Sequence, residues 1–141
     1  MMEGLQTARL IVDSGMCVLI WMVQLIIYPA FHAITSARFS LWHSEYMQAI
    51  GTIVMPLMIL RALFTLGSCY LRPGLWTFLA LGCMLIAWAV TALYSVPAHQ
   101  ALQAHGYQSA VVDRLVLTNW IRTCAWSALF LISLYTAIKT P

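Results

Sequence analysis

Four long apolar runs dominate this chain of 141 residues, and they restrict its possible folds more than any other feature. A helix needs about 20 apolar residues to cross a hydrocarbon core roughly 30 Å thick. Hydrophobic residues make up 62% of the chain and charged residues only 8%, whereas soluble domains carry about 25% charged residues. We therefore expect an all-α integral membrane protein, a bundle of four transmembrane helices over approximately residues 10–29, 47–71, 75–96 and 115–138.

These four spans leave almost no residues for a separate soluble domain, so we interpret residues 1–141 as a single membrane domain. The first span exceeds the roughly 7 to 15 apolar residues of a secretory signal and contains Asp13. We therefore expect it to be retained as a membrane helix. The four cysteines show no paired Cys-x-x-Cys spacing, and we expect them to pack as small apolar residues.

The distribution of basic residues indicates an orientation in the membrane. With four spans, both termini and the connection between the second and third spans lie on one side. That side carries Arg9, Arg72 and Lys139, whereas the opposite side carries Arg38 and Arg114. Because cytoplasmic loops are enriched in Lys and Arg, this small excess predicts that both termini are cytoplasmic, in a bacterial inner membrane.

Two charged residues lie inside the apolar spans at comparable depth from the side of the termini. Asp13 is in the first span and Arg61 is in the second. Ionisable groups at membrane depth cost roughly 2.5 to 3.5 kcal/mol on insertion scales unless they have a partner. We predict a structural ion pair between Asp13 and Arg61; the alternative is a proton or ion path.

All four histidines fall on the side opposite the termini, where they follow odd-numbered spans or precede even-numbered ones. His32, His43 and His99 lie at such ends, and Asn119 and Arg122 lie one or two turns into the fourth span. Residues three apart share one side of a helix, so these groups can line a pocket between the helices. The alternative is interfacial anchoring, because histidine tolerates both water and lipid.

The residue types on this side limit the cofactors that such a pocket could hold. A carboxylate-bridged di-iron centre needs several acidic ligands, and only Glu45 and Asp113 are available, so we exclude that class. A single copper, zinc or iron ion bound by His32, His43 and His99 stays open, as does one haem held by two of these histidines. A site with neither metal nor haem is the remaining alternative.

Without a cofactor, the same residues are suited to acid–base catalysis. His43 or His99 could take a proton from an acidic C–H or O–H group of a lipophilic substrate, and Asn119 or Arg122 could stabilise the resulting oxyanion. These groups could instead bind a quinone or a lipid headgroup. The chain has no glycine-rich phosphate loop and no basic patch suited to nucleic acid, so we expect no nucleic-acid partner.

Four motifs together carry a resemblance to a known family. They are Tyr-Pro-Ala-Phe-His at 28–32, Trp-His-Ser-Glu-Tyr at 42–46, Val-Pro-Ala-His-Gln-Ala-Leu at 96–102 and Leu-Thr-Asn-Trp-Ile-Arg-Thr-Cys-Ala-Trp at 117–126. In this order they resemble small bacterial four-helix membrane proteins and, more distantly, the anthrone oxygenase family. The likeness covers most of the chain by layout and about a dozen residues by identity.

The resemblance implies a function for three residues. His99 or its neighbour stands where the family has Asn, and His99, Asn119 and Arg122 would be the functional side chains. The implied activity is oxygenation of a polycyclic phenolic substrate without an obvious cofactor.

These observations favour two hypotheses of different classes. The first is a membrane oxidoreductase or oxygenase that acts on a phenolic, quinone or lipid-like substrate admitted from the bilayer. The second is a non-catalytic, or haem- or metal-binding, subunit of a larger membrane complex; a homo-oligomer is also open. A transporter is disfavoured because few polar residues lie in the middle of the spans.

Overall fold

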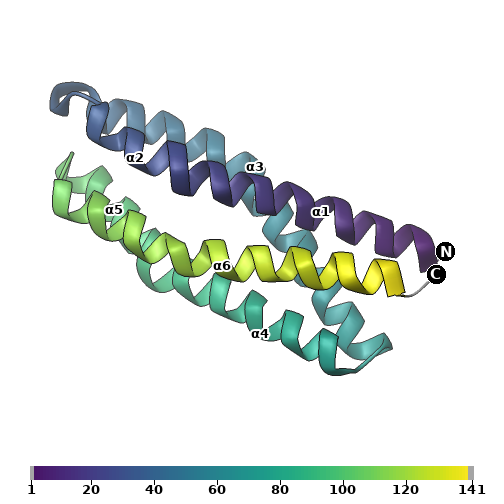
Figure 1. Cartoon of the computed structure of the whole chain (residues 1–141). Coiled ribbons are helices and arrows are strands. Elements are labelled where there is room, and N and C mark those ends of the chain that lie inside the picture. The colour runs from purple at the N-terminus through teal and green to yellow at the C-terminus, as the bar shows by residue number, and fades with distance from the viewer. Residues whose placement is uncertain (1, 140–141) are drawn as a thin grey trace.

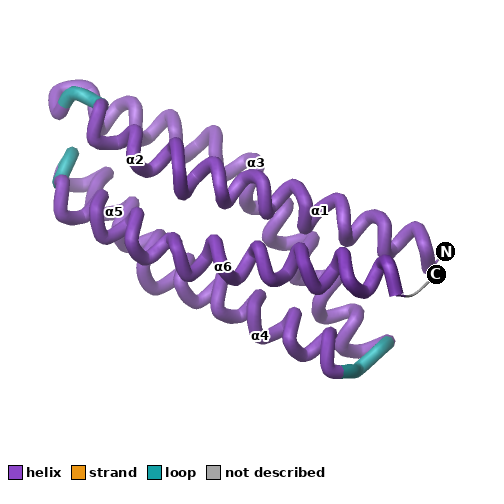
Figure 2. The backbone as a smooth tube through the Cα atoms, in the orientation of Figure 1, coloured by secondary structure: helices purple, strands orange, loops and turns teal. Residues whose placement is uncertain are grey.

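Four long helical segments run up and down the length of the protein (Figure 1). In the computed structural model, which describes residues 2–139, they are the only regular structure and no strand is present. The tube in Figure 2 shows that only short connections join them. The segments long and apolar enough to cross a membrane are Gly4–Ala33, Ser36–Leu71, Leu75–His105 and Ser109–Lys139.

Two of the segments are continuous helices and two are composite. The second segment is helix α3, Ser36–Leu71, and the fourth is helix α6, Ser109–Lys139. The first segment combines α1 (Met2–Met22), a π-helical turn η1 (Val23–Ile27), α2 (Tyr28–Ala30) and a 3₁₀ turn η2 (Phe31–Ala33). The third combines α4 (Leu75–Val90), a π-helical turn η3 (Thr91–Ser95) and α5 (Val96–His105).

The helices close a ring in which each long segment has two neighbours. Helix α1 packs against α3 and α6, and α4 packs against the same two helices from the other side. Figure 1 shows that α3 lies near α1 at the end far from the termini and crosses to α4 at the end where the termini lie. An apolar core that includes Met16, Met58, Met84, Trp126 and Leu129 fills the middle of the bundle.

The fold class expected from the sequence, an all-α bundle of four membrane-spanning helices, is confirmed. The predicted helices are shorter than the observed ones. The second helix begins at Ser36 rather than Met47, the third segment extends to His105, and the fourth helix begins at Ser109. The apolar runs mark only the part of each helix in hydrocarbon, whereas α3, at 36 residues and about 54 Å, is longer than the hydrocarbon core.

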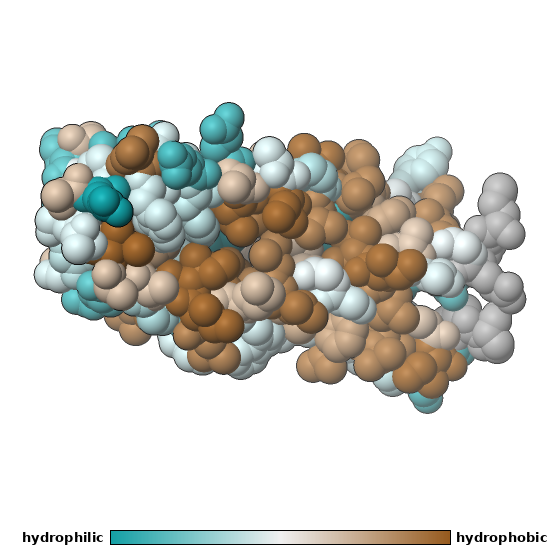
Figure 3. Space-filling view, turned by 90° about the horizontal axis from the view of Figure 1, so that it is seen from above, coloured by the Kyte–Doolittle hydropathy of each residue, from teal (hydrophilic) through white to brown (hydrophobic). Residues whose placement is uncertain are grey.

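The outer surface is suited to a lipid environment. Large apolar side chains are exposed along every long helix, for example Ile11, Leu63, Leu85, Leu117 and Leu131. In the space-filling view of Figure 3, hydrophobic colour covers most of the visible face, while hydrophilic colour gathers at the end far from the termini. The protein is an integral membrane protein whose apolar band faces lipid.

Both composite segments contain a π turn immediately before a proline. In η1 the Tyr28 N–H donates to the Val23 carbonyl, and in η3 the Val96 N–H donates to the Thr91 carbonyl. Pro29 and Pro97 follow one residue later and cannot donate a backbone hydrogen bond. Each π turn accommodates one extra residue in the helix and is often found at a functional site.

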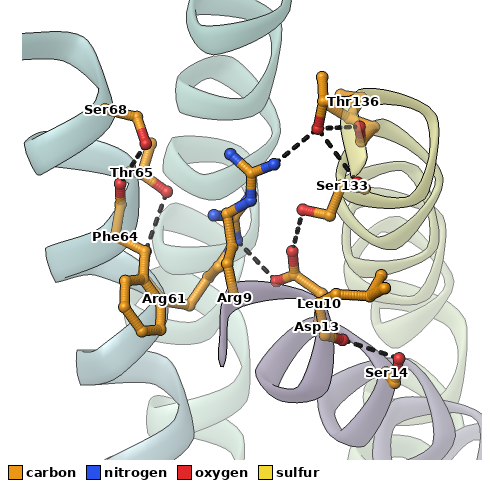
Figure 4. Close-up of polar contacts among 11 residues, drawn as sticks. Arg9, Leu10, Asp13, Ser14, Arg61, Phe64, Thr65, Ser68, Ser133 and Thr136 are labelled. Atoms are coloured by element: carbon orange, nitrogen blue, oxygen red, sulfur yellow. Dashed lines mark hydrogen bonds and ion pairs between the residues drawn. The ribbon is translucent and has the colours of Figure 1, made fainter. Parts of the chain in front are cut away.

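Near the termini, a cluster of polar side chains joins three of the four segments. We call it the termini-side cluster: Arg9, Asp13, Arg61, Ser133 and Thr136 (Figure 4). Arg61 Nε lies 2.7 Å from Asp13 Oδ1, and both side chains are almost fully buried. The contact is a close ion pair, without the alignment of a hydrogen bond. Ser133 donates a hydrogen bond to the other carboxylate oxygen of Asp13.

This ion pair generates a stability prediction. Asp13→Leu or Arg61→Leu alone leaves the other charge buried without its partner, and each should lower the free energy of unfolding by about 3–5 kcal/mol. The double variant removes both charges and should recover most of that loss. Denaturant titration in mixed micelles measures the effect. A double variant as unstable as the less stable single variant would contradict this interpretation.

Candidate functional site

At the end far from the termini, four side chains form a continuous line of hydrogen bonds, which we call the histidine relay: Gln103, His43, His99 and Tyr28. His43 Nδ1 lies 3.0 Å from Gln103 Oε1, and His43 Nε2 lies 3.0 Å from His99 Nδ1. His99 Nε2 lies 3.1 Å from the Tyr28 hydroxyl. His43, His99 and Tyr28 are buried, whereas Gln103 is exposed. The relay therefore connects the protein surface to the interior of the bundle.

The direction of each hydrogen bond in the relay follows from its exposed end. The Gln103 carbonyl oxygen can only accept, so His43 Nδ1 carries the proton and donates to it. His43 Nε2 of the neutral ring is then an acceptor and takes the bond from His99 Nδ1–H. His99 Nε2 in turn accepts from the Tyr28 O–H. With both imidazoles neutral, every ring nitrogen of the pair is satisfied.

Aromatic side chains enclose the two imidazoles and keep them packed against each other. The rings of His43 and His99 stack with centroids 5.2 Å apart, and Phe39 stacks on His43 at 5.5 Å. Phe31, which is fully buried, meets both histidines edge-on. Tyr46 lies against both rings as well. Aromatic rings therefore surround the two imidazoles and restrict the side-chain rotamers that His43 and His99 can adopt.

A second set of polar side chains, centred on Arg122, adjoins the buried end of the relay. Arg122 Nη1 donates to Asn119 Oδ1 at 2.9 Å and to Ser95 Oγ at 3.3 Å. Asn119 Nδ2 donates to Gln24 Oε1 at 2.9 Å. The Arg122 guanidinium also interacts electrostatically with the Tyr28 hydroxyl and the His99 ring. Arg122 thus links the relay to helix α6.

The π turns supply two of these contacts. Gln24 belongs to η1 and Ser95 to η3, and both point into the bundle towards α6. Tyr28 and His99 follow the two turns within four residues. The two composite segments therefore deliver their polar side chains to one level of the bundle.

Arg122 retains unused hydrogen-bonding capacity. Its side chain is 6% exposed, and its Nε–H is buried without an acceptor among the described residues. Among the side chains of residues 4–139, the ion pairs that the structure shows join Asp13 to Arg61 and Asp113 to His32, and no carboxylate pairs with Arg122. Buried donors and charges in native proteins almost always have partners. An uncompensated guanidinium beside the relay is therefore suited to receive an anionic oxygen.

His32 does not join His43 and His99, so the predicted three-histidine metal site is not formed. Its Nε2 lies 3.2 Å from Asp113 Oδ1 and its Nδ1 lies 2.8 Å from the Tyr107 hydroxyl, at the surface. No three His, Cys, Asp or Glu side chains among the described residues are grouped to hold a metal ion. The reason is local: the 3₁₀ turn η2 directs Phe31 into the core and the next residue, His32, outwards.

The arrangement of the histidine pair also differs from the one expected for a bis-histidine haem. Such a haem needs two imidazoles on opposite faces of the porphyrin, each with a nitrogen directed at the iron. His43 and His99 direct nitrogens at each other, 3.0 Å apart. In this arrangement the pair is a hydrogen-bonded relay, and the described side chains leave no gap between the two rings.

All four residues predicted as catalytic, His43, His99, Asn119 and Arg122, lie in this buried region. The structure adds further members, Tyr28, Gln103, Gln24 and Ser95. Tyr28 begins the 28–32 motif, and Gln103 directly follows the 96–102 motif. The sequence shows that both residues are polar and lie near the ends of spans. Tyr and Gln are too common at membrane interfaces for this to identify them as site residues.

Comparison of the chain with protein-family models, with curated proteins and with solved structures finds no match.

The directed relay gives a spectroscopic prediction. His43 and His99 should both be neutral Nδ1–H tautomers, because Gln103 accepts at one end and Tyr28 donates at the other. Nitrogen-15 NMR of histidine-labelled protein in micelles distinguishes the two tautomers by the chemical shifts of Nδ1 and Nε2. Replacement of the acceptor in Gln103→Leu should broaden or shift the His43 signals, while the His32 signals stay in place. An Nε2–H tautomer at either relay histidine would contradict the proposed direction.

Proposed function

We propose that the protein is an integral membrane enzyme, of oxidoreductase or oxygenase type, that removes a proton from a lipophilic phenolic or quinone-like substrate. One observation supports this most directly. Arg122, a buried arginine without a carboxylate partner among the described residues, adjoins a His–His–Tyr relay that leads to the surface. A substrate anion formed beside Arg122 would supply the missing negative charge.

His99 is the general base in this proposal, acting through the Tyr28 hydroxyl, which passes its own proton to His99 Nε2 as it takes one from the substrate. A proton taken up at His99 Nε2 allows the Nδ1 proton to pass to His43 Nε2, and the His43 Nδ1 proton can leave at the exposed Gln103 end. Positioned acid–base groups of this kind contribute about 10²–10⁴-fold to a rate. This transfer leaves both imidazoles neutral, as Nε2–H tautomers, and a proton returned from the exposed Gln103 end restores the Nδ1–H forms as the product is protonated through Tyr28.

Arg122 stabilises the deprotonated substrate. Its unsatisfied Nε–H and its charge are held in place by Asn119 and Ser95 before any substrate arrives. Preorganised donors in an apolar site act more strongly on a developing anion than donors in water do. An electron-rich phenolate or carbanion is the form of such a substrate that gives up electrons to an acceptor or reacts with oxygen, as the resemblance to anthrone oxygenases implies.

The apolar surroundings favour a lipophilic substrate. Lipid-facing helices surround the site, and the nearest side chains are aromatic. The π turns at the level of the site interrupt regular helical hydrogen bonding in two of the four segments. We infer that substrate enters between helices from the bilayer, with the composite segments yielding to admit it.

Activity of site variants tests the proposal. With anthrone or a reduced quinone as probe, His99→Ala and Arg122→Gln should each lower kcat/KM by about 10² or more, measured as oxygen uptake or dye reduction by protein in nanodiscs.

The protein offers a matched control on the same side of the membrane. His32→Ala removes a surface histidine and should leave kcat/KM within about twofold of the original. Thermal unfolding of each variant separates loss of chemistry from loss of fold. Equal activity in His99→Ala and His32→Ala, with both folded, would rule out the relay as the base. Purification with a stoichiometric membrane partner and no turnover would favour the subunit hypothesis.

We also propose that the protein lies in a bacterial inner membrane with both termini cytoplasmic. Arg9, Arg72 and Lys139 lie on the side of the termini, which carries the larger number of basic residues. A green fluorescent protein fused to the C-terminus should fluoresce, and an alkaline phosphatase fused there should be inactive. The same reporters inserted at Gly106, in the connection before α6, should give the opposite result.

A further inference from the structure

A cavity of about 480 Å³ opens between α1, α3 and α4 at the end of the termini, remote from the histidine relay. Its walls are apolar on one side, with Leu63, Phe64, Leu71, Leu75 and Trp76 among the lining residues. The volume lies within the range of about 300–1,000 Å³ that is usual for small-molecule sites. Apolar walls of this kind suit an acyl chain or another hydrocarbon group.

The other side of the cavity is polar and leads towards the termini-side cluster. Arg9, Ser68, Thr77 and Thr136 line it, and the same residues line a smaller adjoining cavity of about 30 Å³ that reaches Arg61. Figure 4 shows Arg9 extending between α3 and α6 towards Thr136. The Arg9 Nη2 group donates to Thr136 Oγ1 at 2.6 Å, whereas its Nε–H is buried with no hydrogen-bond partner among the described residues.

Arg9 provides an unused donor beside the two cavities. The Asp13 carboxylate is in contact with Arg61 and Ser133. Among the side chains that the structure describes, no carboxylate lies within ion-pair distance of Arg9. A ligand with an anionic head would give the Arg9 guanidinium a counter-charge at membrane depth, where an uncompensated charge is costly.

Because the apolar lining of this cavity lies beside Arg9, we propose that the cavity binds an amphiphile, which has an acyl chain and an anionic oxygen head, either a carboxylate or a phosphate. The head lies against Arg9, and the chain lies along the apolar lining residues of α3 and the start of α4. This site is separate from the histidine relay and does not depend on the proposed catalytic function.

Native mass spectrometry of the delipidated full-length protein in detergent tests this site with three probes. Phosphatidylglycerol and oleate carry the two anionic heads, and phosphatidylcholine is the zwitterionic control. We expect at least one anionic probe to bind about tenfold or more tightly than phosphatidylcholine, since charge-assisted hydrogen bonds to arginine are strong. Binding of phosphatidylglycerol alone identifies a membrane lipid, and binding of oleate alone identifies a free fatty acid.

Two variants connect that binding to the cavity. Arg9→Gln should weaken binding of the anionic probe about tenfold. Gly67 lines the cavity, and a Cβ placed there meets no atom within 4 Å, so Gly67→Leu should fill the space and abolish binding without disturbing the fold. If Arg9→Gln does not fold, Gly67→Leu still decides the outcome.

The matched controls are Arg38→Gln and Gly51→Leu. Arg38 is an exposed arginine at the opposite end, and Gly51 lies on the same helix as Gly67 with equally open surroundings. Both should leave binding within about twofold. Equal binding of all three probes, anionic binding that survives Gly67→Leu, or equal loss in the control variants would overturn the proposal.

Discussion

The cost of burying polar groups in an apolar bilayer is the constraint on which the rest of this structure depends. Backbone groups satisfy it by forming helices throughout residues 2–139, apart from short connections. Side chains satisfy it by gathering at two levels, the termini-side cluster and the histidine relay with Arg122. The apolar core around Met16, Met58 and Leu129 separates the two levels.

The two levels differ in how completely their charges are neutralised. In the termini-side cluster, Asp13 is held between Arg61 and Ser133, so one buried arginine has a carboxylate partner. At the relay, Arg122 has amide and hydroxyl partners and no carboxylate partner among the described residues. The Asp13–Arg61 pair is therefore suited to a structural role, whereas Arg122 is suited to bind an anion.

Apolar runs predicted the four helices because length and composition alone decide whether a helix can cross a bilayer. They could not predict the ends: Ser36–Tyr46 carries Arg38, His43 and Glu45, yet continues helix α3 beyond the hydrocarbon. The placement of polar residues at one end of the spans predicted that His43, His99, Asn119 and Arg122 lie in one region. It misassigned His32 because inward and outward directions alternate within a few residues of a 3₁₀ turn. Partners such as Tyr28 depend on π turns, which hydropathy does not reveal.

The paired π turns have a consequence for how the chain tolerates change in length. Each accommodates one residue beyond the regular helical repeat, and one residue corresponds to about 100° of rotation around the helix axis. Deletion of one residue within Val23–Ile27 or Thr91–Ser95 would therefore convert that turn into regular α-helix, and Tyr28 and His99 would keep their angular positions. Deletion of one residue in regular helix just after either turn would instead rotate the side chains that follow it away from their partners. The two π turns are thus the places where each segment can lose a residue without misaligning the polar interior.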